Sequence, residues 1–177
     1  NPHAVVGDFD SLGRVPEGEN VYRHPKMKDD TDMMLAVKLA LSRGHQTLLL
    51  HGGTGGRPDH TMANYQALAY IESRGAQGYL MGAQTATCIS RGVLRFDSGR
   101  RGLLSVFAHG GAALGVGLRG LLYPLENHTL TCDDPLGVSN EFTGEGAEVS
   151  VSQGMLLVFF GDPAFPLPRR VSYPENT

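Results

Sequence analysis

The first half of the chain alternates short apolar runs with segments of helical periodicity. Apolar runs predict three strands, and two longer segments place apolar side chains on one helical face. Such alternation is typical of a parallel sheet with crossover helices. The central run is apolar at nearly every position, as a strand covered on both faces requires. The predicted strands lie at residues 4–7, 46–52 and 77–82, and the predicted helices at residues 31–44 and 58–75.

Capping residues support both predicted helices. In the first helix, Thr31 or Asp30 is the expected N-cap, and Gly44 stands where a C-terminal cap belongs. In the second helix, Pro58 lies in the first turn and Gly75 just past the last one. Both segments therefore have the start and stop signals of real helices.

After residue 91 the helical pattern ends. Short segments follow, several of which alternate apolar and polar residues, with Gly, Asn, Asp and Pro between them. This pattern is typical of a small antiparallel sandwich or barrel. We therefore predict an α/β fold in which a parallel-sheet domain, residues 1–91, precedes a small antiparallel β-sandwich domain, residues 92–165. The proline-rich tail, residues 166–177, is expected to be extended or loosely attached.

The composition narrows the class of protein. The chain has 177 residues, of which 41% are hydrophobic, and its net charge is -3, which excludes a general nucleic-acid binder with a basic surface. No apolar run approaches the roughly 20 residues of a membrane span, so we expect no membrane partner. Cys88 and Cys132 lack CxxC spacing, and we expect two reduced thiols in a cytoplasmic protein.

Two aspartates end the first predicted strand, in the stretch VVGDFDSL. Asp8 and Asp10 would face the same side if the strand continued. They would then lie at the carboxyl end of a parallel strand, where ligands bind in open α/β sheets. Two carboxylates on one side repel unless a cation or proton separates them, and Mg²⁺ prefers such oxygen ligands. The alternative is a turn in which Asp10 or Ser11 caps a helix.

A second acidic group, KDDTD at residues 28–32, begins the first predicted helix. The helix dipole favours carboxylates there, so capping alone would explain them. Asp29 and Asp32 lie one helical turn apart and can share a face, and Lys28 can pair with a phosphate. A solvated helix cap and a functional site explain this acidic group equally well.

The third group, HGGTGGRPDH at residues 51–60, is the most specific. Four glycines in five residues remove the side chains, so backbone N–H groups can approach a phosphate at the positive end of the next helix. Arg57 supplies a fork for phosphate oxygens, and Asp59 can bind a metal or orient a hydroxyl. The loop is neither a Walker A loop nor a GxGxxG fingerprint.

The three groups would converge on one crevice of a parallel sheet. Carboxylates for Mg²⁺, a glycine cradle and an arginine are what phosphoryl transfer needs, because its catalysis is mainly positioning and charge neutralisation. The sequence therefore predicts an enzyme that acts on phosphate groups.

The blocks GDFDSL, KDDTDMMLAVKLAL and GGTGGRPDHTMANYQAL resemble the signature blocks of the thiamine pyrophosphokinase family. Fainter similarities follow in GLRGLLYPL, GVSNEF and VSVSQGMLLVF. The resemblance implies an α/β nucleotide-binding domain for ATP and Mg²⁺, a β-sandwich domain that helps to bind thiamine, and a homodimer with active sites at the subunit interface. The implied reaction moves the diphosphate of ATP to the hydroxyl of thiamine and releases AMP.

The resemblance also implies roles for individual residues. Asp32 or Asp59 would accept the proton of the thiamine hydroxyl, and Ser139 and Asn140 would contact thiamine, from the partner subunit. The Mg²⁺ ligands would be Asp8, Asp10 and Asp32. The ATP phosphate side would be formed by Lys28, Asp29, Thr31, Gly52, Gly53, Gly55, Gly56, Arg57 and His60.

Two departures from the family pattern bear on these roles. The family normally begins with another strand and an ADGG-like segment before the first block, and this chain shows neither. Some members have a tryptophan in the block that matches GLRGLLYPL, whereas this chain has no Trp. Leu121 or Tyr123 would then form the apolar wall for the thiamine rings.

Three rival functions account for part of the pattern. A glycosyltransferase with paired aspartates leaves the glycine loop without a role. A phosphatase with Asp8 as nucleophile would need a lysine and a late acidic pair that the sequence does not offer. A non-catalytic thiamine or nucleotide sensor would not need the full set of acidic residues. Release of AMP would separate the transferase from all three.

Overall fold

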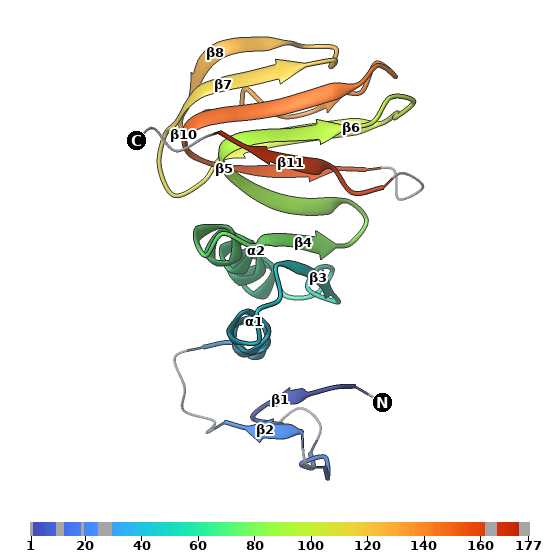
Figure 1. Ribbon diagram of the computed structural model, residues 1–177, viewed down its shortest axis with the longest axis vertical. Helices are drawn as coiled ribbons and strands as arrows, with labels where there is room; N and C mark the ends of the chain where they lie inside the picture. The colour runs from blue at the N-terminus through green and yellow to red at the C-terminus, as the bar shows by residue number, and fades with distance from the viewer. Residues whose placement is uncertain (1, 10–12, 19, 25–29, 162–165, 174–177) are drawn as a thin grey trace.

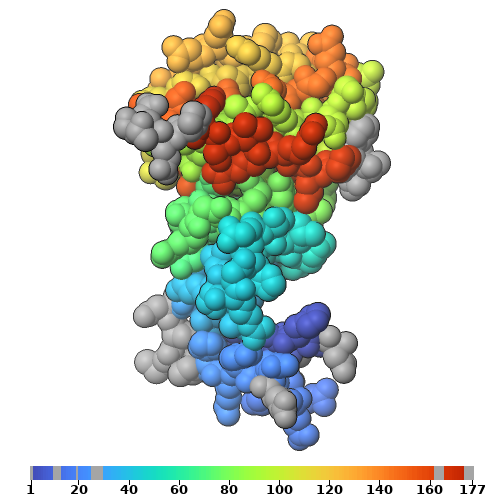
Figure 2. All heavy atoms as spheres, viewed as in Figure 1, coloured from blue at the N-terminus to red at the C-terminus, as the bar shows by residue number. Residues whose placement is uncertain are grey.

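The computed structural model describes residues 2–9, 13–18, 20–24, 30–161 and 166–173. A small two-stranded sheet lies at one end, the helices lie in the middle, and a broad β-sandwich forms the other end (Figure 1). The space-filling view shows that the N-terminal half is narrower than the sandwich (Figure 2). Neither helix in the described part of the chain has the length and apolar character that a membrane span requires.

The N-terminal half contains the predicted strands and helices. Two short strands pair in parallel in a sheet of their own, and two further parallel strands are joined by a helix. Thr31 caps the first helix, and Gly44 and Gly75 follow the helix ends with positive φ, as predicted. The elements are β1 (Val5–Gly7), β2 (Val21–Arg23), α1 (Asp32–Ser42), β3 (Thr47–His51), α2 (Pro58–Ser73) and β4 (Gln77–Met81).

The C-terminal half consists of antiparallel strands, as predicted. Two segments that the sequence pattern separates, around residues 147–153 and 155–161, form one long strand with an irregularity between Val151 and Met155. The strands are β5 (Thr85–Phe96), β6 (Leu103–Ala108), β7 (Ala113–Arg119), β8 (Leu125–Leu130), β9 (Asn140–Glu141), β10 (Ala147–Phe160) and β11 (Arg169–Ser172).

The main sheet is mixed, and this corrects the predicted parallel sheet. Nine strands form it, in the order β3-β4-β5-β10-β6-β9 with β7, β8 and β11 attached, and within it only β3 and β4 pair in parallel among the described strands. Residues 82–84 link β4 to β5. So short a link returns the chain antiparallel, because a parallel neighbour needs a long crossover. The protein is therefore α/β with a mostly antiparallel sheet.

The two halves share the central strands β5 and β10. Alternate residues of these strands point to opposite faces. Cys88 and Leu157 join the core beneath α2, whereas Ile89 and Leu156 join the sandwich core. β5 runs through the predicted boundary at residue 91, where Arg91 has a φ of 45°. One sheet thus carries both the helices and the sandwich.

The run at residues 46–52 is covered on one face only. Leu48 and Leu50 are buried, but Leu49 between them is 51% exposed. The expectation of a strand covered on both faces is therefore wrong for this position in the structure described.

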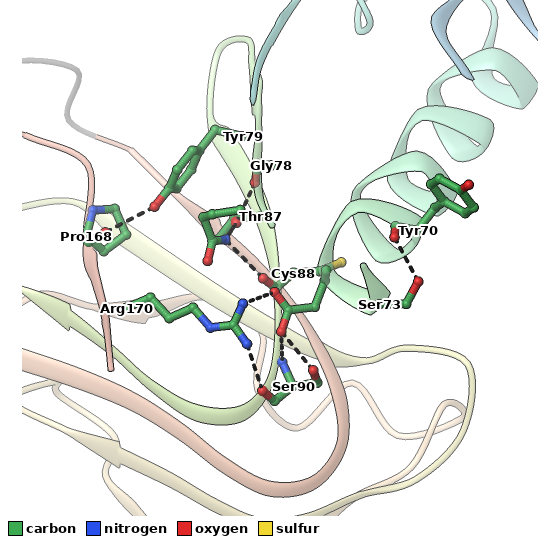
Figure 3. A network of polar contacts seen from close by, with 11 residues as sticks. Tyr70, Ser73, Gly78, Tyr79, Thr87, Cys88, Ser90, Pro168 and Arg170 are labelled. Atoms are coloured by element: carbon green, nitrogen blue, oxygen red, sulfur yellow. Dashed lines mark hydrogen bonds and ion pairs between the residues drawn. The ribbon is translucent and has the colours of Figure 1, made fainter. Parts of the chain in front are cut away.

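Of the two expectations for the tail, the extended chain is confirmed for β11, whereas the loose attachment is wrong for residues 166–173. β11 pairs with β5 and lies on the surface of the sandwich (Figure 2). Figure 3 shows part of its attachment, in which Tyr79 donates to the carbonyl of Pro168 over 3.0 Å. In addition, Arg170 Nη1 lies 2.7 Å from Glu72 Oε2. Glu72 also accepts hydrogen bonds from the backbone and hydroxyl of Ser90. A buried carboxylate needs such partners, so the tail is held by an ion pair.

Candidate active site

The first functional side chains follow β1 and begin α1. A side chain at Gly7 would lie 3.2 Å from the Asp32 carboxylate, so the glycine lets this carboxylate approach the end of β1 beside Asp8. The strand ends at Gly7, and Phe9 has a φ of 62° with its ring buried. Asp8 and Asp10 would face the same side only if the strand continued past Gly7, and this condition is not met as far as Phe9. Positive φ costs a non-glycine residue about 1–2 kcal/mol, and such residues cluster at functional sites.

Asp10 lies outside the described residues, as do Lys28 and Asp29. Their predicted roles as metal and phosphate contacts stay predictions.

At the start of α1, Asp30 and Asp32 on either side of Thr31 have different surroundings. Thr31 accepts a hydrogen bond from the backbone of Met34 over 3.2 Å, which leaves Asp32 in the first helical turn. Asp30 instead pairs with Lys38, whose ammonium lies 2.7 Å away, and this hydrogen bond raises the pKa of Lys38. Asp30 thus serves the helix surface, and Asp32 faces the end of β1.

The glycine loop after β3 needs its glycines for two different reasons. Gly52 and Gly55 have φ of 74° and 86°, which other residues rarely adopt. Gly53 has no room for a side chain, because a Cβ would lie 2.6 Å from Leu80 Cδ1. Asn64 of α2 donates a 2.8 Å hydrogen bond to the Gly53 carbonyl and so fixes this part of the loop.

Arg57 and Asp59 form an exposed ion pair at the start of α2. The guanidinium lies 2.5 Å from Asp59 Oδ2 and donates a second bond of 3.1 Å to Oδ1. The hydrogen bond from Arg57 is the largest cause that lowers the pKa of Asp59. A carboxylate with a lowered pKa is a weak proton acceptor, which argues against Asp59 as a base.

A cleft of about 600 Å³ unites the ends of β1, β3, α1 and α2, and we call it the glycine cleft. Asp59 and Gly55 are not among the described residues that line it. The positive end of α2 opens into it through His60 and Thr61. Its lining residues are Asp8, Thr31, Asp32, Met33, Gly52, Gly53, Thr54, Gly56, Arg57, His60, Thr61 and Asn64.

Four of these residues were not predicted from the sequence: Met33, Thr54, Thr61 and Asn64. A signal for two of them was present. Arg57, His60, Thr61 and Asn64 are spaced as i, i+3, i+4 and i+7, which places them along one side of a helix. Asn64 is a polar residue on the buried side of α2, and this position indicates a contact with the loop before the helix.

The donors of the glycine cleft suit an oxygen-binding cation. No group of three or more His, Cys, Asp or Glu side chains suited to a metal is present in the described ranges. The cleft nevertheless offers the carboxylates of Asp8 and Asp32 and no sulfur ligand from cysteine. Mg²⁺ binds through one or two carboxylates together with substrate phosphates, so these residues fit it.

The predicted thiamine residues lie elsewhere. Asn140 begins β9, at the opposite end of the strand order from β3, and Ser139 directly precedes it. Five interstrand steps of about 4.8 Å make a path of roughly 24 Å along the sheet between the two strands. Of the two candidates for an apolar wall, Leu121 is buried in the sandwich core, whereas Tyr123 is 63% exposed. Tyr123 is therefore the one that a ligand can reach.

Comparison with known proteins accounts for both regions. The family description "Thiamin pyrophosphokinase, catalytic domain" matches residues 1–80, and "Thiamin pyrophosphokinase, vitamin B1 binding domain" matches residues 94–156. The chain is 26% identical over 166 residues to the thiamine pyrophosphokinase of Bacillus subtilis (strain 168), a match that covers 89% of this chain and 77% of that protein.

Solved structures give the same result. A thiamin pyrophosphokinase family protein from Enterococcus faecalis has a TM-score of 0.75 at 30% identity, over 91% of this chain and 80% of that one. Yeast thiamin pyrophosphokinase has a TM-score of 0.66 at 17% identity, over 90% of this chain and 69% of that one, which is a likeness of fold alone. The glycine cleft, the sandwich and these matches together show that the chain belongs to the thiamine pyrophosphokinase family.

Proposed function

We propose that this protein transfers the diphosphate group of ATP to the hydroxyl of thiamine, giving thiamine diphosphate and AMP. The observation that carries the proposal is the glycine cleft, where carboxylates from β1 and α1 meet a glycine loop and an arginine from β3 and α2. Phosphoryl transfer needs both parts, because catalysis depends on holding the phosphates and neutralising their charge.

The nucleotide would bind through its phosphates at the start of α2. Gly52, Gly53 and Gly56 line the cleft without side chains, so their backbone groups are open to phosphate oxygens. Arg57 is exposed at the rim, and its planar fork suits two oxygens at once. ATP would exchange the Arg57–Asp59 pair for a pair between Arg57 and phosphate.

The same cleft supports a Mg²⁺-dependent reaction. Asp8 and Asp32 would hold the ion, with Asp10 added by resemblance to the family. When bound, Mg²⁺ neutralises charge on the phosphate oxygens. Lys28, Asp29 and Thr31 complete the proposed phosphate side.

The reaction requires one bond to form and one to break. The hydroxyl oxygen of thiamine attacks the β-phosphorus, and the bond between this phosphorus and the oxygen of the α-phosphate breaks to release AMP. Asp32 would accept the hydroxyl proton, because it lines the cleft while Asp59 does not and has a lowered pKa. The loose transition state of phosphoryl transfer makes only modest demands on this base.

The thiamine side would come from a second copy of the chain. β9 lies five strands along the sheet from β3, and neither Ser139 nor Tyr123 lines the glycine cleft of its own subunit. The start of β6 and the loops beside β9 also expose five large apolar side chains, a surface that suits a protein contact. These residues are Leu103, Leu122, Tyr123, Leu136 and Val138. We therefore propose a homodimer with shared active sites, in the cytoplasm, where its unpaired cysteines would stay reduced.

The test is a product assay with the purified protein. ATP, Mg²⁺ and thiamine are incubated, AMP and thiamine diphosphate are separated by chromatography, and controls omit thiamine or Mg²⁺. We expect AMP and thiamine diphosphate in equal amounts, and neither product in the controls.

Other outcomes would contradict the proposal in distinct ways. ADP instead of AMP would indicate transfer of a single phosphoryl group. Binding of thiamine without any product would favour a sensor. Transfer of sugar from a nucleotide-sugar would favour the glycosyltransferase, which is disfavoured because it gives the glycine loop no role.

A further inference from the structure

Asn140 is a polar residue that is almost completely buried in the loops beside β9. Only 3% of its surface is exposed, and its side-chain amide makes three hydrogen bonds to backbone groups. Its oxygen accepts from the backbone of Tyr123 and of Glu141, each over 2.9 Å. Its nitrogen donates to the Tyr123 carbonyl over 2.7 Å.

These bonds give Asn140 the role of a strand partner. It pairs with both the N–H and the C=O of Tyr123, as a residue of a neighbouring strand would do. An amide oxygen has two lone pairs, and both are engaged. Of its two N–H donors one is bound to Tyr123, and the burial of the side chain leaves the other little access to a ligand.

Other contacts around Asn140 also hold this turn, which comprises residues 121–124. The backbone of Leu122 donates to the Glu141 carbonyl over 2.9 Å, and Leu121 forms a bridge with Phe142 and is buried. The Tyr123 backbone is thus fixed from two sides, while its ring is exposed.

Ser139, next to Asn140, has a φ of 60°, and its backbone donates to the Ser105 hydroxyl over 3.0 Å. A positive φ at serine persists only where the surroundings impose it. The chain therefore enters β9 in a fixed conformation, and the Asn140 amide is aimed at the turn.

We propose that Asn140 is a positioning residue, which recognises thiamine only by holding Tyr123 in place. The inference rests on the proposed function, and it replaces the direct contact that the family resemblance implies for Asn140. The rigid turn presents the Tyr123 ring as a flat apolar surface for the aromatic rings of thiamine. Because the ordering of the turn is complete before binding, thiamine binds without that entropic cost.

The first measurement needs no substrate. Backbone amide exchange of residues 121–123 is compared in the full chain, in Asn140→Ala, and in Gln153→Ala as a control that removes an exposed amide from β10. We expect the Tyr123 amide to exchange about tenfold faster in Asn140→Ala and to be unchanged in the control. An unchanged Tyr123 amide in Asn140→Ala would overturn the proposal.

The second measurement separates positioning from contact. We expect Asn140→Ala to raise the KM for thiamine about tenfold and to leave the KM for ATP unchanged. In a Tyr123→Ala background the same substitution should have almost no further effect, because the ring it positions is gone. Additive effects of the two substitutions would mean that Asn140 contacts thiamine itself.

Asn140→Asp covers the case in which the alanine variant does not fold. Aspartate keeps both accepted bonds and loses the donated one, so its thiamine KM should lie between those of the wild type and the alanine variant. Its effect should also vanish with Tyr123→Ala. If the wild type forms no thiamine diphosphate, the proposed function fails, and amide exchange still decides whether Asn140 holds the turn.

Discussion

The glycine cleft and the 121–124 turn are built in opposite ways, although we assign both to substrate binding. In the cleft, backbone and charge dominate, since Gly53 has no room for a side chain and Asp32 lies at the end of β1. In the turn, the buried Asn140 fixes the backbone and leaves the Tyr123 ring exposed.

The difference follows from the chemistry of the two ligands. Phosphate oxygens are recognised by N–H groups and cations, so side chains must be absent from the loop that cradles them. An aromatic ligand is recognised by flat apolar area, so a side chain must be presented on a rigid support. A substitution in one region should therefore alter one substrate and spare the other.

The largest effect is expected in the cleft from Asp32→Asn. Asparagine keeps the shape of the side chain but removes the charge and the basic oxygen. We expect kcat to fall at least about 100-fold, with the far-UV circular dichroism unchanged.

Asp30→Asn is the matched control, because Asp30 is two residues away and pairs only with Lys38 among the contacts described for it. Exposed pairs of this kind contribute little, so kcat should stay close to that of the wild type. Equal losses in the two variants would mean that the total negative charge of this segment matters, and not the place of Asp32 in the cleft.

The next effect concerns the backbone of the cleft. In Gly53→Ala the new Cβ would lie 2.6 Å from Leu80 Cδ1 and 2.9 Å from Asn64 Nδ2, both of which are buried. Overpacking of this kind costs about 1–3 kcal/mol, and the KM for ATP should rise while the KM for thiamine stays constant.

Urea unfolding measures the stability cost of Gly53→Ala. Gly56→Ala is the control for stability, because a Cβ at residue 56 would have no atom of the described residues within 4 Å and the φ there is not positive. Equal destabilisation by both substitutions would contradict the packing argument.

The turn is tested by Tyr123→Ala and Tyr123→Phe. Loss of the ring should raise the KM for thiamine about tenfold and leave the KM for ATP unchanged, whereas phenylalanine keeps the ring and should behave like the wild type. Tyr173→Ala removes an exposed tyrosine from the end of β11 and serves as the control. A large effect of Tyr123→Phe would show that the hydroxyl, and not the ring, carries recognition.

Local patterns predicted those parts of the fold that local forces decide. The apolar periodicity and the caps of α1 and α2 depend only on residues within each helical segment. Both helices therefore form where the sequence predicts them. The joining of the two predicted domains into one mixed sheet was not predicted, because it depends on the short link after β4, which returns β5 antiparallel to β4, and not on either strand's own residues. The attachment of the tail was missed for a similar reason: Arg170 meets Glu72 across nearly a hundred residues of sequence.

The candidate site shows the same limit. The glycine loop could be recognised, because its composition departs strongly from that of an ordinary loop. The hydrogen bond that supports the loop could not be predicted, because Asn64 resembles any other polar residue on a helix. Only the structure shows that it bonds to the Gly53 carbonyl. Asn140 was assigned to thiamine through the family resemblance, which does not reveal that its side chain bonds to the backbone of Tyr123.

The smallest effect is expected at Glu72, where the helix α2 that borders the glycine cleft meets the sandwich. This residue ends the helix whose start lines the glycine cleft, and its carboxylate is buried against β5 and β11. Burial raises the pKa of Glu72 above its ordinary value of 4.5, while the hydrogen bonds from Ser90 and the charge of Arg170 oppose this rise.

The sign of the pH dependence follows from that shift. A raised pKa means that the folded protein holds the proton more tightly than the unfolded chain, so Glu72 lowers stability as the pH rises from about 4.5 through its folded pKa. Glu72→Gln mimics the protonated form at every pH. Its free energy of unfolding should therefore increase relative to the wild type as the pH is raised from about 4 to about 7, as measured by urea unfolding. The exposed Glu145→Gln controls for the loss of a negative charge. A relative decrease would mean that the ion pair with Arg170 outweighs the cost of burial, and that charge attraction, rather than packing, joins the cleft helix to the sandwich.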